Sequence, residues 1–122
     1  MEKYRLLRDL VATYSDIELI EPAAATNQDL LRAHDVDYIE AVTQGKLSEA
    51  QVREIGFPWT EAMVERSRRS AGATIAACLS ALKEGVSVNL AGGTHHAYAD
   101  KGSGFCVFND AAVAARYVQA LQ

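Results

Sequence analysis

Two short strand-like segments in an otherwise helical sequence constrain the possible fold most strongly. Residues 17–20 form a brief apolar run, and Val86, Val88 and Leu90 alternate with polar or small residues ahead of a glycine turn. Strands that alternate with helices favour an α/β fold with parallel pairing. Two strands are too few for an independent parallel sheet, which needs neighbouring strands and helices on both faces.

Apolar periodicity and capping residues predict helices over most of the remaining sequence. The longest has Thr60 as its cap and Gly85 after its end, with Glu65, Arg66, Arg68 and Arg69 on its solvated face. The predicted helices cover residues 2–14, a short stretch capped by Thr26, the stretch from Asp35 to Gly45, that from Ser48 to Gly56, about residues 61–83, and about residues 111–120 after Asn109 or Asp110.

Composition excludes several classes of protein. The sequence has 122 residues, the size of a single domain with one core. A net charge of -4 gives no basic footprint for nucleic acid, and no apolar run is long enough to span a membrane. The N-terminus lacks the apolar stretch of a signal peptide. Cys78 and Cys106 lie in apolar segments without metal-ligand spacing, which favours reduced thiols and a cytoplasmic location.

The pair His95-His96 is the strongest chemical signal in the sequence. Adjacent residues of a strand point to opposite faces, so two imidazoles can share a site only where the backbone turns. Gly92-Gly93 supplies such a turn directly after a predicted strand, at the end where α/β folds bind ligands. Histidine transfers protons near neutral pH. The alternative interpretation is a pair of ordinary polar loop residues.

Two motifs around this pair resemble a known family. Gly-Gly-Thr-His-His-Ala at residues 92–97, followed by Gly-Phe-Cys-Val-Phe-Asn-Asp at residues 104–110, resembles the zinc-dependent deacetylases of the histone deacetylase superfamily, with the closest likeness to bacterial class IV-like members. The resemblance implies a helix-rich fragment of the three-layer α/β/α arginase/deacetylase-like fold. It also implies catalytic proton transfer by His95 and His96, and substrate binding by Gly104, Phe105 and Cys106 along an acyl-lysine channel.

The resemblance also predicts that no metal ligand lies in this sequence. The family takes its zinc ligands from an Asp-x-His and a further Asp that follow the Gly-Phe-Cys segment. Here the residues after Asp110 contain no Asp, Glu, His or Cys. A catalytic zinc site needs about three protein ligands and one open position. We therefore expect no cofactor in this chain, although the complete family enzyme uses zinc.

These features predict one partial domain over residues 1–122, without the first strand and the C-terminal metal-binding part of the family. The favoured function is a truncated deacetylase-like protein that is inactive as given and forms a homo-oligomer through unpaired strand edges. One alternative is an amide hydrolase acting on acyl-lysine or acyl-polyamine, completed by a longer chain or by a partner. Another is a small binding module whose pocket walls are His95, His96 and Phe105.

His34 has two interpretations. With Asp35 and Asp37 it could contribute to a metal cluster, but these residue types are also usual helix caps. The sequence around His34 and Tyr38 resembles a structural turn of the deacetylases. His34 is therefore predicted to mark a helix boundary, and Trp59 to fill part of the core.

Overall fold

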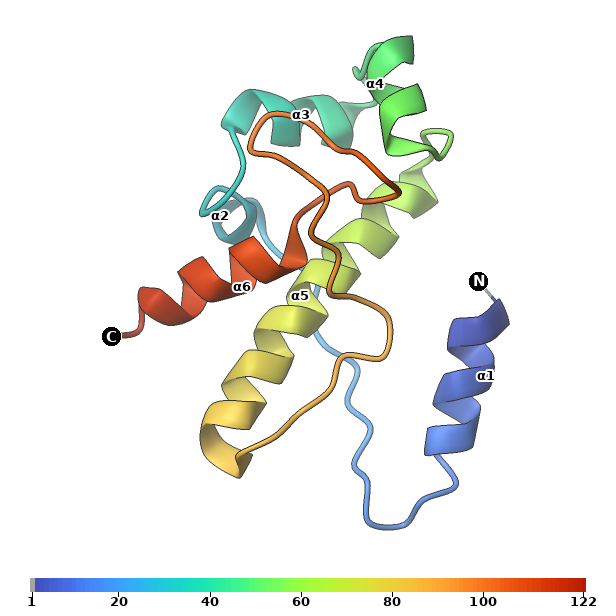
Figure 1. Cartoon of the computed structure of the whole chain (residues 1–122), viewed down its shortest axis with the longest axis vertical. Helices are drawn as coiled ribbons and strands as arrows, with labels where there is room; N and C mark the ends of the chain where they lie inside the picture. The colour runs from blue at the N-terminus through green and yellow to red at the C-terminus, as the bar shows by residue number, and fades with distance from the viewer. Residues whose placement is uncertain (1) are drawn as a thin grey trace.

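The computed structural model describes residues 2–122, and six helices lie within them (Figure 1). A single long helix, α5, runs through the middle of the molecule, and the other helices are arranged around it. The helices are α1 (Glu2–Val11), α2 (Asn27–Leu30), α3 (Val36–Gln44), α4 (Glu49–Ile55), α5 (Glu61–Glu84) and α6 (Asp110–Gln119).

The helix ends follow local sequence closely. Thr26 begins α2 and Ser48 begins α4 with complete capping boxes, and the Thr60 hydroxyl accepts a hydrogen bond from the backbone N–H of Met63. Glycines end α3, α4 and α5 in the left-handed conformation. Two details of the prediction are wrong: α1 ends at Val11 instead of residue 14, and Asp35 precedes α3 without a capping hydrogen bond from its side chain.

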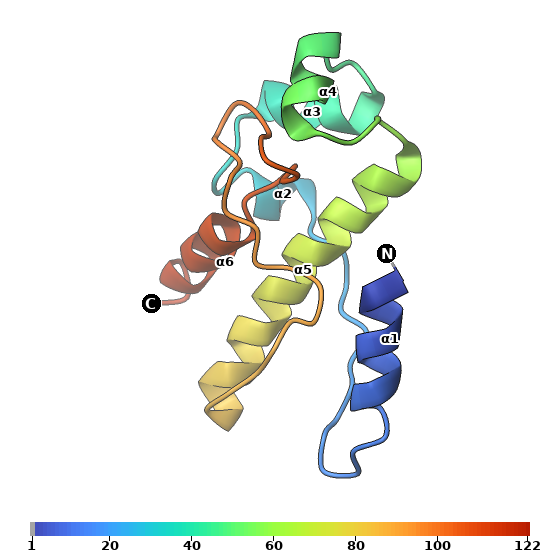
Figure 2. The ribbon, with the colours of Figure 1, turned by 45° about the vertical axis from the view of Figure 1, so that its right-hand side comes forward.

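The predicted α/β class, a three-layer α/β/α arrangement with few parallel strands, is wrong for the described residues 2–122. They contain no β-sheet, and the only bridge in this range joins Ser103 and Cys106. Residues 17–20 and 86–89 lie in irregular, non-helical backbone with no ladder (Figure 2). A strand is stable only when its N–H and C=O groups bond to a neighbour, and neither segment has one here. The result is a helical domain.

The core lies between the first half of α5 and the helices that pack on it. Helix α6 makes the most extensive contact with α5, and α3 packs on α5 as well. The backbone of residues 23–25 approaches α5 at Gly72, where an added Cβ would lie 2.0 Å from the carbonyl oxygen of Ala23. The largest fully buried apolar side chains are Phe108, Leu30, Ile39, Ile55, Val42, Val113 and Cys106.

The predicted solvated face of α5 is interrupted at Arg68. Its guanidinium is partly buried and donates hydrogen bonds to the carbonyl of Ala25, the side-chain oxygen of Asn27 and the hydroxyl of Thr43. Arg68 thus ties the α2 region and the end of α3 to α5. Trp59 packs against the core and donates its indole N–H to the carbonyl of Val42 at 2.7 Å, which confirms its predicted structural role.

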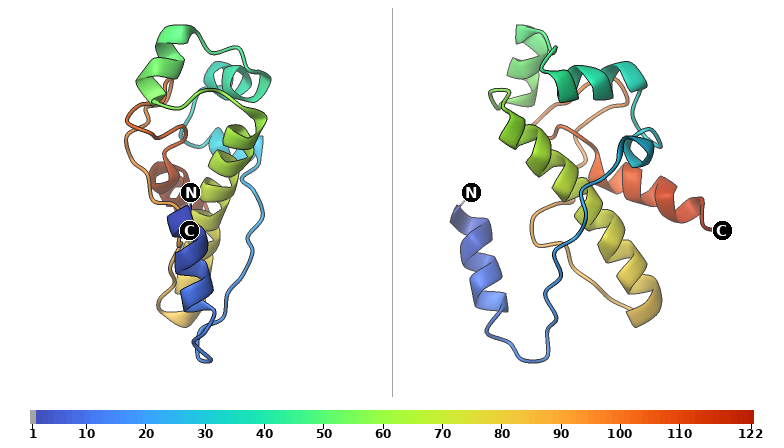
Figure 3. Two further views of the ribbon diagram at one scale, coloured as in Figure 1. Left: turned by 90° about the vertical axis from the view of Figure 1, so that its right-hand side faces the viewer. Right: turned by 180° about the vertical axis from the view of Figure 1, so that it is seen from behind.

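Helix α1 lies at the edge of the molecule. It buries no residue, and an extended stretch of chain separates it from α2 (Figure 3). Leu6, Leu7 and Leu10 are exposed on it. Of the helices described, none combines the length and the apolar character needed to cross a bilayer.

Candidate active site

The two adjacent histidines lie together on one exposed loop. The imidazole centroids of His95 and His96 are 4.3 Å apart, and the ring planes differ by 35°. Gly93, two residues earlier, has a φ of +91° that favours glycine. The predicted turn is therefore present, and it brings two imidazoles to one place despite their adjacency in the sequence. Within residues 2–122 neither imidazole hydrogen-bonds to another side chain.

Asp110 anchors the loop just before the pair. Its side chain is 2% exposed, and one carboxylate oxygen accepts hydrogen bonds from the backbone N–H of Gly93 at 3.0 Å and from the hydroxyl groups of Ser70 and Thr74 at 2.7 and 3.2 Å. The Thr94 hydroxyl lies 3.5 Å from its other oxygen. Buried carboxylates need several such donors. One side chain thus joins the loop to both α5 and α6.

Asn109 anchors the same loop at and after the pair. Its side-chain amide donates to the carbonyl oxygens of His95 at 3.3 Å and Ala97 at 3.1 Å. Its side-chain oxygen accepts from the N–H of Ala112, so Asn109 is also the N-cap of α6. Its own backbone N–H donates to Nε2 of His34 at 3.0 Å. Asn109 and Asp110 therefore hold the histidine loop on both sides from the start of α6.

A tight turn at Gly104 and Phe105 lies beside the histidines. Both residues have positive φ, +53° and +62°, as the central pair of a type I′ turn requires, and Ser103 and Cys106 exchange hydrogen bonds across it. A Cβ added to Gly104 would lie 3.2 Å from Cγ of His96. The Gly104 backbone therefore packs directly against that histidine, where a larger residue would crowd it.

The Phe105 side chain points outward from this turn. Its ring is 64% exposed and lies 5.3 Å from the Phe57 ring, and its backbone N–H donates to the carbonyl of Ile55 at 2.7 Å. Positive φ is strained for a bulky residue, and these contacts hold it in place. Cys106, in contrast, is buried beneath the turn, and its thiol donates to the carbonyl of Phe108. Phe105 and His96 therefore flank Gly104, whereas Cys106 faces the core.

A small cavity of about 110 Å³ lies behind the loop. Phe105 and Phe108 form its apolar side and Asp110 with Thr94 its polar side, and Tyr4 of α1 also reaches it. The two imidazoles do not line this cavity. The cavity therefore lies between the Asp110 carboxylate, the turn at Phe105 and the core residue Phe108.

The described residues do not fit a complete catalytic zinc site. In residues 2–122 no group of three or more His, Cys, Asp and Glu side chains is arranged to hold a metal ion. Asp110, the carboxylate nearest to the loop, is occupied by hydrogen bonds to protein groups. Cys78 and Cys106 are both free thiols, as predicted. The described residues thus offer two neighbouring imidazoles without the further ligands that zinc requires.

The sequence interpretation missed three residues that support the site. Asn109 and Asp110 are predicted as helix caps and as the end of the motif at residues 104–110, and His34 as a helix-boundary residue. His34 does lie between α2 and α3, but it is 3% exposed and hydrogen-bonded to Asn109. Capping chemistry and the family resemblance of the flanking sequence are the only local signals for them. Their contacts with the loop join residues far apart in the sequence, which no local pattern reveals.

The family of the chain follows from comparison with known proteins. Residues 1–122 match the histone deacetylase domain over their whole length, so the chain belongs to the histone deacetylase domain family. Two solved structures of HDAC homologues, one complexed with SAHA and one from Aquifex aeolicus, superpose on it with a TM-score of 0.79. Each is 30% identical, and the match covers 97% of this chain and 34% of theirs.

Curated relatives agree with this assignment. An uncharacterised protein of Picosynechococcus is 39% identical over 98% of this chain, the acetoin utilization protein AcuC of Bacillus subtilis 32% identical over 95%, and the histone deacetylase clr6 of Schizosaccharomyces pombe 33% identical over 93%. The chain spans 41%, 32% and 31% of their respective lengths. The match therefore concerns one part of a deacetylase domain.

Proposed function

We propose that these residues form the part of a zinc-dependent deacylase that supplies its proton-transferring histidines and one wall of its acyl channel. The observation that carries the proposal is the packing of the His95 and His96 rings, 4.3 Å apart, on an exposed loop of a chain that belongs to the histone deacetylase domain family. Paired imidazoles can remove a proton from attacking water and return one to a leaving amine near neutral pH.

Gly104, Phe105 and Cys106 serve the substrate in this proposal. The Gly104 backbone lies against His96, so its peptide group can contact an amide held close to the imidazoles. The exposed Phe105 ring offers an apolar surface for the methylene stem of an acyl-lysine or acyl-polyamine. Cys106 supports the turn from below. The substrate class is therefore an acylated primary amine on a flexible alkyl stem.

In this proposal the chain of residues 1–122 by itself binds no zinc tightly and hydrolyses no amide. The described residues hold no set of three metal ligands, which supports this expectation. Completion by further polypeptide, in the same chain or from a partner, supplies the missing ligands. The shares of 31% to 41% of the relatives' lengths are consistent with such completion.

The chain by itself also self-associates in this proposal. Large apolar side chains are exposed on two irregular, non-helical segments of the described chain, where they lack neighbours. They include Ile17, Leu19, Ile20, Val86 and Val88, and the exposed fractions of the two valines are 75% and 73%. Irregular backbone with unpaired N–H and C=O groups and apolar side chains favours pairing with another chain.

Two measurements on the purified chain test the catalytic proposal. Metal analysis should find no stoichiometric zinc, and an acetyl-lysine reporter should not be turned over. A chimera in which this chain replaces the matching third of the Aquifex aeolicus homologue should bind zinc and hydrolyse the reporter. In that chimera His95→Ala or His96→Ala should lower kcat by about 10²- to 10⁴-fold, as the loss of general acid–base catalysis predicts.

The matched control in the chimera is Leu121→Ala, an exposed position near the end of the chain, which should leave kcat unchanged. Stoichiometric zinc together with turnover by the isolated chain would disprove the expected inactivity. Wild-type kcat in a zinc-loaded chimera that lacks both imidazoles would disprove the proton-transfer role.

A further inference from the structure

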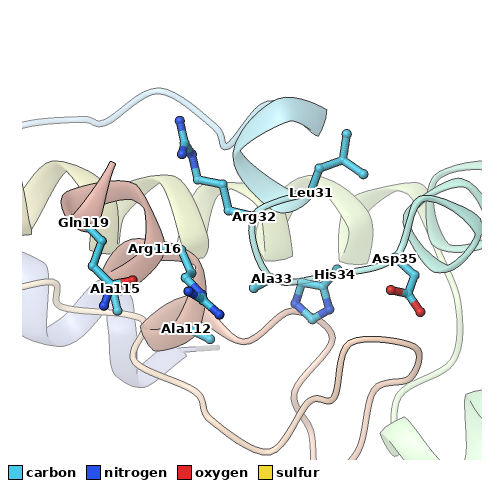
Figure 4. A pocket seen from close by; sticks show the side chains of 9 residues that line it. All are labelled: Leu31, Arg32, Ala33, His34, Asp35, Ala112, Ala115, Arg116 and Gln119. Atoms are coloured by element: carbon cyan, nitrogen blue, oxygen red, sulfur yellow. The ribbon is translucent and has the colours of Figure 1, made fainter. Parts of the chain in front are cut away.

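His34 lies at the end of a chain of contacts that leads to the histidine loop. It projects from the connection between α2 and α3 towards the segment that enters α6 (Figure 4). Its Nε2 accepts the backbone N–H of Asn109 at 3.0 Å, and the Asn109 side chain in turn donates to the carbonyls of His95 and Ala97. The sequence separation between His34 and Asn109 is 75 residues.

The contact defines the protonation state of His34. A backbone N–H can only donate, so Nε2 must be the unprotonated acceptor and the neutral ring carries its proton on Nδ1. Nδ1 is buried near the carbonyl oxygens of Tyr98 and Ala99 but forms no hydrogen bond of ordinary geometry with a described residue. If Nε2 were protonated, its N–H would face the backbone N–H of Asn109, and neither group could accept a hydrogen bond from the other. The observed contact therefore requires a neutral imidazole.

The surroundings of His34 also disfavour a charge. The rings of Tyr38 and Phe108 lie 5.6 and 5.4 Å from it. Burial lowers the pKa of His34, although the carbonyls of Ala99 and Tyr98 and the carboxylate of Asp35 oppose this effect. Burial raises the pKa of Tyr38, so that hydroxyl stays neutral. Arg32 and Arg116 line the same surface hollow as His34, and the Arg32 guanidinium is directed away from the imidazole, over the ring of Tyr117 (Figure 4).

We propose that His34 is a pH-sensitive positioning residue, which holds the His95-His96 loop in place through Asn109 only while its imidazole is neutral. Protonation removes the acceptor of the Asn109 N–H, and Asn109 must then turn. The side-chain amide of the same residue holds the carbonyls of His95 and Ala97, so the loop loses both contacts together. The effect on hydrolysis rests on the proposed function, whereas the loop movement is measurable without any activity.

Nuclear magnetic resonance of the full chain tests this proposal. The three histidine rings and the amides of Asn109, His95 and Ala97 are followed from pH 8 to pH 5. The Asn109 and Ala97 amide signals should shift with the midpoint of the His34 ring, below 6.5. In His34→Gln this transition should vanish, because the Gln side-chain oxygen accepts the same N–H and does not titrate.

Two further variants separate the outcomes. His95→Gln should leave the Asn109 transition unchanged. His34→Leu removes the acceptor at every pH and should speed hydrogen exchange of the Asn109 amide about tenfold, the equivalent of one lost hydrogen bond. If His34→Leu does not fold, the comparison of the wild type with His34→Gln still tests the proposal.

An Asn109 transition with the wild-type midpoint in His34→Gln would overturn the proposal. The proposal would also be overturned if the Asn109 amide signal of the wild type did not shift while the His34 ring titrates. A His34 ring that stays neutral until the chain unfolds would overturn it as well. Failure of the proposed deacylase function would instead appear in the chimera, without any change in these signals.

Discussion

The carboxylate of Asp110 lies 3.0 Å from the backbone nitrogen of Gly93, and this contact fixes the turn that precedes the histidine pair. The same oxygen accepts hydrogen bonds from two hydroxyl groups of α5. The position of a surface loop therefore depends on a side chain that is buried at the start of another helix. Loops that carry function are usually positioned by such rigid scaffolds.

Replacing Asp110 should destabilise both the domain and the loop. Asp110→Ala leaves the Gly93 N–H without an acceptor and returns the Ser70 and Thr74 hydroxyl groups to the backbone carbonyls of Ala91 and Ser70, so the free energy of unfolding should fall by about 1–3 kcal/mol in urea titrations. Asp110→Asn should cost less, because an amide oxygen can replace the carboxylate oxygen that accepts three hydrogen bonds. The control is the exposed Asp16→Ala, expected to be neutral. Equal stability of Asp110→Ala and wild type would contradict the anchoring role.

The positive φ of Phe105 predicts an unusual order of stability at that position. Phe105→Gly and Phe105→Ala lose the same ring, but only glycine adopts a φ of +62° without strain. Phe105→Gly should therefore be the more stable variant by about 1 kcal/mol in urea unfolding. At the helical position Ala115 the order should reverse, with Ala115→Gly about 1 kcal/mol less stable than wild type. A Phe105→Ala variant more stable than Phe105→Gly would rule out the turn geometry.

Two glycines of α5, Gly72 inside the helix and Gly85 at its end, should respond differently to alanine. At Gly72 the added methyl would overlap the backbone of Ala23, in a segment that the hydrogen bond from the Ala25 N–H to the Arg68 carbonyl holds against α5, so Gly72→Ala should cost about 3 kcal/mol or more or prevent folding. At Gly85 no atom lies within 4 Å, and only its positive φ opposes alanine. Gly85→Ala should therefore cost about 1–2 kcal/mol. Thermal unfolding of both variants compares them directly, and similar losses would disprove the close approach at α5.

The stability of the domain should fall as the pH drops below about 6.5, the pKa of an unperturbed histidine. Burial lowers the pKa of His34 in the folded state, so the unfolded chain binds a proton more readily in this range. The His34 contribution is therefore complete above the unfolded pKa and is lost as the pH falls towards the folded value. Urea unfolding at pH 7.5 and pH 5.5 measures the loss, and His34→Gln should show a smaller difference. A larger loss of stability between pH 7.5 and pH 5.5 in His34→Gln than in the wild type would show that folding does not lower the pKa of His34.

Charge on the segment at residues 86–88 should reduce self-association. Val86→Lys with Val88→Lys places two positive charges where apolar side chains are exposed, and the measured mass in light scattering should shift towards that of one chain. Val36→Lys is the matched control, because Val36 is also exposed but lies on the helical surface of α3. A wild-type chain that remains a monomer at high concentration would exclude the proposed association.

Local features of this chain were largely predictable. Thr26, Ser48 and Thr60 begin helices and Gly85 ends one, since capping involves only residues within a few positions of each other. The turn at Gly92-Gly93 that gathers the two imidazoles is local too. The family likewise follows from contiguous motifs. Each of these predictions depends on short-range backbone chemistry, which a sequence displays directly.

The tertiary structure decided the remaining features. Residues 17–20 and 86–89 have strand-like sequences but form no sheet in the described chain, because a strand needs a partner that its own sequence cannot specify. From the sequence Asp110 is interpreted as a helix cap, whereas in the structure its carboxylate accepts a hydrogen bond from the Gly93 N–H. His34 is interpreted as a helix-boundary residue, whereas its Nε2 accepts a hydrogen bond from the Asn109 N–H. The contacts of Asp110 and His34 bring together groups that are distant along the chain, and burial turns each into a strong constraint because an unpaired polar group is costly there.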